Sequence, residues 1–179
     1  MKQVYIIFCL ILGGVFIAEC QPSSPDDIFC NMSYIVDYGN GSQKVRLGNG
    51  KYRYPDRHPL LCVYYEGEFV YGDFNSDELK DAAVIIYDSG GGSGYSINLA
   101  FLINDGTQLV HKSSYDLGYR PDIISLAEQQ GKVVIDMRVY NESTWAEGKM
   151  DRVEVTYEYA GPSVWGPDMG LPIQSGIER

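Results

Sequence analysis

The sequence is poor in cysteine, histidine and positive charge, and each shortage argues against a class of function. It has four cysteines and two histidines in 179 residues, without a CxxC pair or histidines at ligand spacing, so a structural zinc site is not expected. Its 24 acidic residues outnumber 14 basic ones, which gives a net charge of −10. An acidic chain does not hold polyanions by general electrostatics. We therefore expect no nucleic-acid partner.

The sequence also lacks long amphipathic helices. Short segments rich in β-branched and aromatic residues are separated instead by turn signals, and its 15 Tyr and 20 Gly suit such a pattern. The turn pairs are Asn49-Gly50, Glu66-Gly67, Asp105-Gly106 and Gln130-Gly131. This spacing predicts an all-β, mainly antiparallel fold in a single compact domain of about 8–10 strands. The nearest approach to a helical period predicts a short helical turn near residues 76–81.

The N-terminus has the features of a secretory signal. One Lys precedes an apolar run from Val4 to Ile17, which is too short for a comfortable membrane span. Cleavage after Cys20 would release the chain, whereas acylation of Cys20 would anchor it as a lipoprotein, and the residues leave both open. We expect an extracytoplasmic protein, periplasmic or secreted, that meets a membrane only through this signal or a lipid anchor.

Composition divides the chain into four parts. Residues 1–20 are the signal peptide and residues 21–29 a polar, Pro-rich leader. Residues 30–160 are the β-rich domain, and residues 161–179 form an irregular tail rich in Gly and Pro.

Two cysteines, Cys30 and Cys62, fall within the predicted domain. In an oxidising compartment they most simply form one disulfide. Such a bond would stabilise the domain by roughly 3 kcal/mol through loop entropy. The alternative is a pair of buried thiols.

One segment, "GDFNSDELKDAAVI", carries a candidate metal site. Counted from Asp73 as position 1, the oxygen-bearing side chains of Asn75, Asp77 and Asp81 stand at positions 3, 5 and 9, and Leu79 can offer its carbonyl at position 7. Ca²⁺ takes about six to eight oxygen ligands, and a curled loop can supply them. The alternative is a turn stabilised by its own Asp and Asn side chains.

The surrounding sequence excludes one Ca²⁺ loop and resembles another. An EF-hand needs Glu at position 12 followed by a helix, but Val84 and a strand-like segment stand there. The segment resembles the D-x-D/N-x-D/N-G-x-x-D loop of the FG-GAP/VCBS family of extracellular β repeats, which binds Ca²⁺. With the later Gly-rich turn, the Leu117–Arg120 segment and the closing hairpin, it also resembles small exported bacterial proteins of unassigned function.

The resemblance implies a ligand set and has one departure. It implies that Asp73, Asn75, Asp77 and Asp81 bind Ca²⁺ with their side chains and Leu79 with its carbonyl. Glu78 stands where the family has Gly, and a positive φ there costs Glu about 1 kcal/mol or more, so binding is expected to be weak. Only one copy of the loop occurs, which argues against a propeller.

No catalytic constellation emerges from the sequence. In "SGGGSGYS", residues 89–96, Tyr95 replaces the last Gly of a nucleophile elbow, and no Lys completes a phosphate loop. We therefore expect an exported, non-enzymatic, monomeric binding or envelope-associated module whose partner is a protein or polysaccharide. The alternative is a hydrolase or enzyme inhibitor acting on envelope polymers through Asp88 or Glu66, which requires two carboxylates at one pocket.

Overall fold

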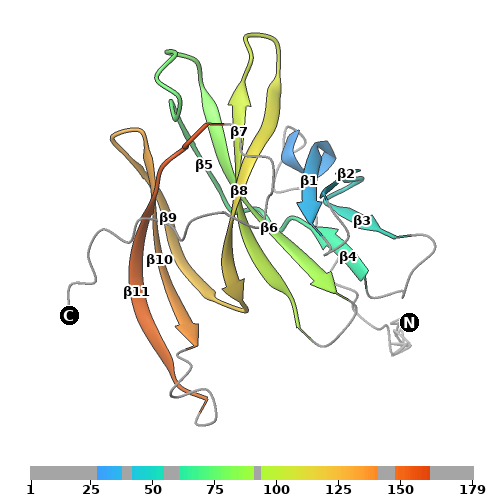
Figure 1. The fold of residues 1–179 in the computed structure, drawn as a ribbon, viewed down its shortest axis with the longest axis vertical. Coiled ribbons are helices and arrows are strands. Elements are labelled where there is room, and N and C mark those ends of the chain that lie inside the picture. The colour runs from blue at the N-terminus through green and yellow to red at the C-terminus, as the bar shows by residue number, and fades with distance from the viewer. Residues whose placement is uncertain (1–27, 38–41, 55–60, 91–93, 141–147, 162–179) are drawn as a thin grey trace, which may run out of the picture.

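The computed structural model describes residues 28–37, 42–54, 61–90, 94–140 and 148–161 (Figure 1). The predicted signal peptide, Cys20, and most of the leader and tail lie outside these residues. Within them, no helix is long and apolar enough to cross a membrane. Ile28 and Phe29, at the end of the predicted leader, belong to a 3-10 helix, and Phe29 is buried.

The described chain is all-β and antiparallel, as predicted, with eleven strands, one more than the expected range. In chain order the elements are η1 (Ile28–Asn31), β1 (Ser33–Asp37), β2 (Ser42–Arg46), β3 (Lys51–Arg53), β4 (Leu61–Tyr64), β5 (Phe69–Gly72), β6 (Asp81–Gly90), β7 (Ser96–Asn104), β8 (Leu109–Tyr119), β9 (Asp122–Gln129), β10 (Lys132–Tyr140) and β11 (Met150–Tyr157).

A six-stranded sheet forms the centre of the fold. Its order is β3-β4-β6-β7-β8, and β5 also pairs with β6. Strands β4 and β5 lie end to end along one edge of β6, where Tyr64 pairs with Tyr87 and Phe69 with Val84. The arms around Glu66-Gly67 therefore do not pair with each other. The turn interrupts an edge of the sheet instead.

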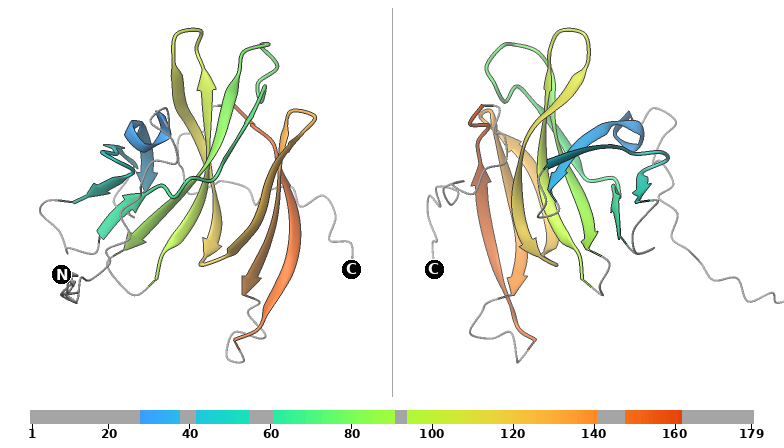
Figure 2. Two further views of the ribbon diagram at one scale, coloured as in Figure 1. Left: turned by 180° about the vertical axis from the view of Figure 1, so that it is seen from behind. Right: turned by 45° about the vertical axis from the view of Figure 1, so that its right-hand side comes forward.

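Two smaller sheets cover the two faces of the central sheet (Figures 1 and 2). The pair β1-β2 lies on one side and the sheet β11-β10-β9 on the other. Side chains alternate along β6, so Val84 and Ile86 point to the first cover, and Ile85 and Tyr87 point to the second. Burial on both faces explains why β6 and β7 are nearly continuous apolar runs.

The two faces have separate apolar cores. Cluster 1 lies under β1-β2 and consists of Phe29, Cys30, Tyr34, Val36, Val45, Leu47, Tyr54, Val63, Tyr65, Ala82, Val84, Ile86, Ala100 and Leu102. Cluster 2 lies under β9–β11 and consists of Phe74, Ala83, Ile85, Tyr87, Ile97, Leu99, Phe101, Ile103, Leu117, Val133, Ile135, Met137 and Tyr157.

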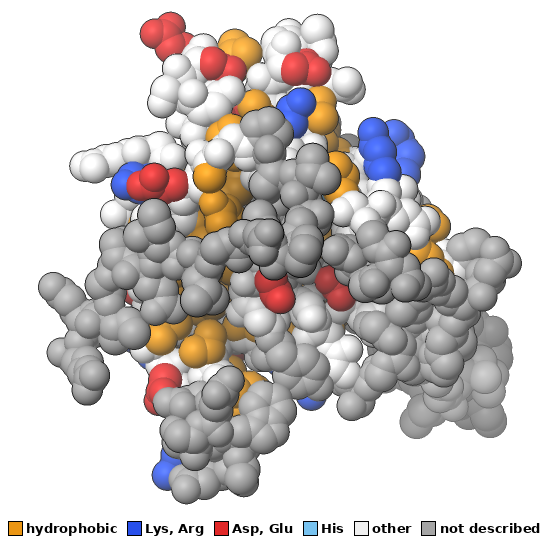
Figure 3. Space-filling view, viewed as in Figure 1, with side chains coloured by type: hydrophobic (Ala, Val, Ile, Leu, Met, Phe, Trp, Pro, Cys, Tyr) orange, Lys and Arg blue, Asp and Glu red, His pale blue; other side chains and the backbone are white. Residues whose placement is uncertain are grey.

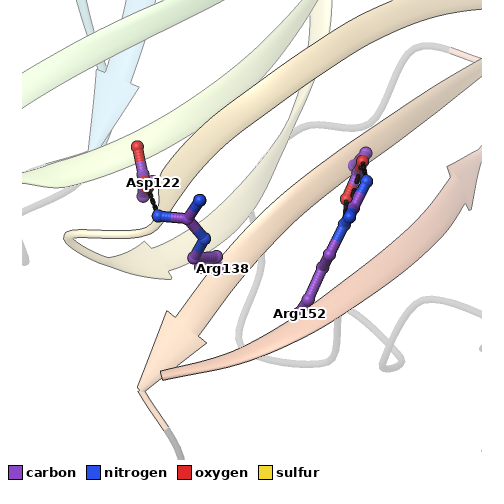
Figure 4. Close-up of polar contacts among 4 residues, drawn as sticks. Asp122, Arg138 and Arg152 are labelled. Atoms are coloured by element: carbon purple, nitrogen blue, oxygen red, sulfur yellow. Dashed lines mark hydrogen bonds and ion pairs between the residues drawn. The ribbon is translucent and has the colours of Figure 1, made fainter. Parts of the chain in front are cut away.

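The outer face of the β9–β11 sheet carries cross-strand ion pairs (Figure 4). Arg138 donates to Asp122 across 2.9 Å, and Arg152 donates to Asp136. Arg138 and Arg152 face each other in register. The repulsion between these two like charges is reduced because each arginine is paired with its own aspartate. The hydrogen bond from Arg152 lowers the pKa of Asp136. The Arg138–Asp122 pair is exposed at both side chains and contributes little to stability.

The predicted disulfide between Cys30 and Cys62 is absent, because both residues are buried thiols. Cys30 lies in cluster 1 together with Val63. Alternation along β4 turns the neighbouring Cys62 to the opposite face, the side on which Tyr64 packs against cluster 2. The central sheet therefore separates the two sulfur atoms.

We expect Cys30 and Cys62 to remain without a bond to each other under oxidising conditions. After unfolding in denaturant without a reducing agent, alkylation should modify both Cys30 and Cys62, and peptide mass mapping should find no cross-linked pair. Adding a reducing agent should leave the unfolding midpoint unchanged, because no bond between these residues constrains the unfolded chain. A mapped Cys30–Cys62 peptide from the folded protein would contradict the arrangement.

Candidate functional site

The predicted metal loop joins β5 to β6 at one end of the central sheet. Figure 3 shows acidic side chains at the tips of two loops at the top of the view, those joining β5 to β6 and β7 to β8. Phe74 anchors the first loop, because its side chain is 6% exposed and packs in cluster 2 with its ring 5.2 Å from that of Phe101. The polar side chains on either side of Phe74 are thus held at a defined place.

The loop is organised by hydrogen bonds from its backbone to its own side chains. The Asp73 carboxylate accepts from the amides of Asp77 at 3.1 Å and Glu78 at 3.0 Å. Asn75 Oδ1 accepts from the Asp77 amide at 3.2 Å, and Asp77 Oδ1 accepts from the Leu79 amide at 2.8 Å. These bonds use amides that a helix would pair with carbonyls. The helical turn predicted near residues 76–81 is therefore wrong, and residues 74–79 form successive bends.

Two residues of the loop have left-handed backbone conformations. Ser76 has φ 61° and Glu78 has φ 66°. Glu78 thus adopts the positive φ that the Gly of the resembled family allows, at a cost of about 1–2 kcal/mol. The hydrogen bond from its amide to Asp73 offsets part of this cost. The departure from the family pattern has not prevented the sharp turn.

Asp81 differs from the other proposed ligands because its side chain is completely buried. Its Oδ2 accepts from the Phe74 amide at 2.9 Å, and its Oδ1 accepts from the Asn104 amide at 2.8 Å. The carboxylate thereby joins the start of the loop and the end of β7 to the start of β6. Asp81 has a structural role whether or not the loop binds a cation.

The loop fits Ca²⁺ only after a local side-chain adjustment. Asn75 Nδ2 donates to Asp77 Oδ2 at 2.7 Å, so an N–H group approaches an oxygen that a cation would require. Nowhere in the described chain do three His, Cys, Asp or Glu side chains form a ready-made metal site. Asp73, Asn75 and Asp77 could hold Ca²⁺ if Asn75 turned its oxygen inward, and the Leu79 carbonyl and water would complete the ligands.

A second group of polar side chains lines a small cavity between β1 and the central sheet. The cavity has about 20 Å³, room for roughly one water molecule, and its lining includes Asp88, Asn98, His111 and Ser114. Asn98 donates to Asp88 at 2.9 Å, and burial raises the pKa of this carboxyl. No motif in the sequence pairs His111 with Ser114. The β8 register shifts between His111 and Ser113, leaving Lys112 outside the pairing.

The hydrogen bonds of His111 argue against serine-type catalysis in this cavity. Its Nδ1 accepts from the Ile35 amide at 2.7 Å, so the neutral ring carries its proton on Nε2. Nε2 lies 2.8 Å from Ser114 Oγ, but a general base must present an unprotonated nitrogen to the serine hydroxyl. This tautomer cannot take the proton of Ser114.

Of the two carboxylates of the hydrolase alternative, Asp88 lines this cavity and Glu66 does not. Asp88 lines the cavity on the cluster 1 side. Glu66 lies on the other side, beside Tyr64, which packs against cluster 2. Their proximity shows in the pKa of Tyr64, which burial and, after it, the charge of Glu66 raise to about 12. Burial and the neighbouring Glu68 carboxylate raise the pKa of Glu66 itself. The Gly-rich segment 91–93 lies outside the described residues.

The described residues define a three-layer β domain with an Asp/Asn-rich loop at one end. Compared with models of protein families, with curated proteins and with solved structures, the chain matches none of them. The FG-GAP/VCBS resemblance therefore stays a prediction, and function must be argued from the geometry of the loop.

Proposed function

We propose that the protein is an exported, non-enzymatic binding module, either soluble or anchored at Cys20, whose β5–β6 loop binds Ca²⁺ weakly. The observation that carries this proposal is the backbone shape of the loop. Asp73 holds the amides of Asp77 and Glu78, so the positive φ of Glu78 is already in place before a cation arrives. Binding then requires side-chain rotation rather than refolding of the loop.

Charge supports the same proposal. Asp73, Asp77 and Glu78 bring three carboxylates into one short, largely exposed segment of an acidic chain. Such groups repel one another, and a divalent cation relieves the repulsion. Solvent exposure and the strained Glu78 argue for an affinity in the range of extracellular Ca²⁺ modules, with Kd on the order of 0.1–1 mM.

The partner is a protein or a polysaccharide of the extracytoplasmic space, and the module acts as a monomer. A loop that Ca²⁺ stiffens at one end of a rigid β domain would present that end to such a partner.

Calorimetry and thermal unfolding test the metal part of the proposal. At about 10 mM Ca²⁺, a site with Kd near 1 mM stabilises the folded state by about 1.4 kcal/mol, so we expect a measurable binding heat and a higher unfolding midpoint. Asp77→Ala should abolish both effects, because it removes a carboxylate from the centre of the loop.

A neighbouring turn provides a matched control. Asp105, between β7 and β8, is likewise exposed and accepts from the amides of Thr107 and Gln108. Asp105→Ala should therefore retain the Ca²⁺ response. Absence of binding heat in the unmodified protein, or an equal response in Asp77→Ala, would reduce the loop to a turn.

A further inference from the structure

A buried histidine connects the β1-β2 sheet to the central sheet. His111 on β8 is 6% exposed, and its Nδ1 accepts from the Ile35 amide on β1 at 2.7 Å. On the opposite side of the ring, Nε2 lies 3.0 Å from the Ser113 carbonyl oxygen and 2.8 Å from Ser114 Oγ. Both nitrogens are engaged, and the bond to β1 exists only while Nδ1 carries no proton.

The element held by this bond is a cover rather than a part of the central ladder. Strands β1 and β2 form a two-stranded sheet of their own. Their side chains Tyr34, Val36 and Val45 are buried in cluster 1 against the central sheet. Displacing the β1-β2 sheet would therefore expose the apolar surface beneath it without breaking the β6-β7-β8 pairing.

Protonation of His111 would act directly on this contact. A proton on Nδ1 would face the Ile35 N–H, which replaces a hydrogen bond with two opposed donors and leaves a buried charge. From β1, the Tyr34 ring lies with its centroid 5.9 Å from that of the imidazole. From β6, Asp88 lines the same cavity, where it already accepts a hydrogen bond from Asn98 of β7. Asp88 is thus the one charged side chain among the described residues that line the cavity.

We propose that His111 is an acid-sensitive latch, whose protonation releases the β1-β2 sheet and uncovers cluster 1. The latch is independent of the Ca²⁺ loop, which lies between other strands. Because the protein is expected outside the cytoplasm, it can meet acidified surroundings. The released form would present an apolar surface that the closed form conceals.

The direction of the pH effect follows from two states: a closed form, in which the β1-β2 sheet covers cluster 1, and an open form, in which that sheet is released. Burial lowers the pKa of His111 to about 4 in the closed form, whereas an exposed imidazole in the open form has a pKa near 6.5. The free energy that favours the closed form over the open form is therefore at its full value above about pH 6.5 and decreases as the pH falls toward about 4. Over that range the open fraction should rise roughly tenfold per pH unit, or about 300-fold in total.

Amide hydrogen exchange of the whole chain tests the latch. Between about pH 6.5 and 4.5, the protection of the Ile35 amide, corrected for intrinsic exchange, should fall roughly 100-fold. His111→Asn keeps an oxygen acceptor near the Ile35 amide but does not titrate, so its protection should stay level. His58→Asn removes the other histidine and should behave as the unmodified protein. The same pH dependence in His111→Asn and the unmodified protein, or none in either, would overturn the proposal.

A titration of the unmodified protein tests the proposal without requiring that a substituted protein fold. Nitrogen chemical shifts of the His111 ring report its protonation, and amide exchange in the same samples reports β1. The proposal expects protonation of His111 to be accompanied by loss of protection at the Ile35 amide over the same pH range. Protonation of His111 while the Ile35 amide remains protected would overturn it.

Discussion

Asp81→Ala is expected to lower the free energy of unfolding by about 3–5 kcal/mol. The substitution leaves the buried amide of Phe74 and the partly buried amide of Asn104 without their acceptor, since each now donates to one oxygen of the Asp81 carboxylate. Each orphaned donor costs about 1–3 kcal/mol. Urea unfolding with a chelator present, so that no cation contributes, measures the effect.

A comparison of two aspartates separates a structural role of Asp81 from a role in metal binding. Asp105→Ala also removes an acceptor of backbone amides, but its turn is exposed to water, so its loss should be clearly smaller. A cost of Asp81→Ala that appears only when Ca²⁺ is present would show that Asp81 acts as a ligand and not as a clamp between strands.

Phe101→Ala is expected to cost a further large amount, about 3–5 kcal/mol. The Phe101 side chain is fully buried in cluster 2. Its ring centroid lies 5.2 Å from that of Phe74, 6.0 Å from that of Tyr115 and 5.9 Å from that of Tyr159. Truncation therefore leaves a cavity between the two sheets and removes three aromatic contacts. Equilibrium unfolding in urea measures the loss.

An exposed apolar residue of the outer sheet gives the control for this substitution. Ile124 is 40% exposed, and the β9–β10 register shifts around it. Ile124→Ala should change stability by no more than about 0.5 kcal/mol. If Phe101→Ala cost no more than this control, the β9–β11 sheet would not pack on the central sheet through cluster 2.

Local sequence signals predicted the turns well because those signals are conformational. Asn49-Gly50 and Gln130-Gly131 are two of the predicted turn pairs. Their residues adopt positive φ values of 52° and 78°, and of 56° and 76°. The second pair closes the β9–β10 hairpin. The first pair is closed by a single antiparallel bridge between Gly48 and Lys51. The pairing extends no further, because β2 belongs to the β1-β2 sheet and β3 to the central one.

The features that the sequence did not predict correctly are contacts between distant strands. Alternation within a strand shows which residues share a face, but not which strand or cluster that face meets. For this reason, the opposite orientations of Cys30 and Cys62 could not be predicted from an even number of cysteines. The proximity of Ser114 to His111 depends on a register shift in β8, which carries no Gly or Pro signal in the sequence.

In the candidate site, too, the local features were predictable from the sequence and the contacts with distant strands were not. The spacing of Asp73, Asn75 and Asp77 predicted a curled loop with side-chain oxygens, and these residues do organise its backbone. The burial of Asp81 depends on Asn104, which is 23 positions away in the chain. Ligand spacing alone therefore did not separate an exposed ligand candidate from a buried structural carboxylate.

A crystal structure determined in about 10 mM Ca²⁺ tests the central claim most directly, since that concentration exceeds the expected Kd by about tenfold. The account predicts a cation in the β5–β6 loop with oxygen atoms of Asp73, Asn75 and Asp77 at about 2.3–2.6 Å, and with the Asn75 amide turned away from Asp77. A loop without a cation, in which Asn75 Nδ2 still donates to Asp77, would contradict it.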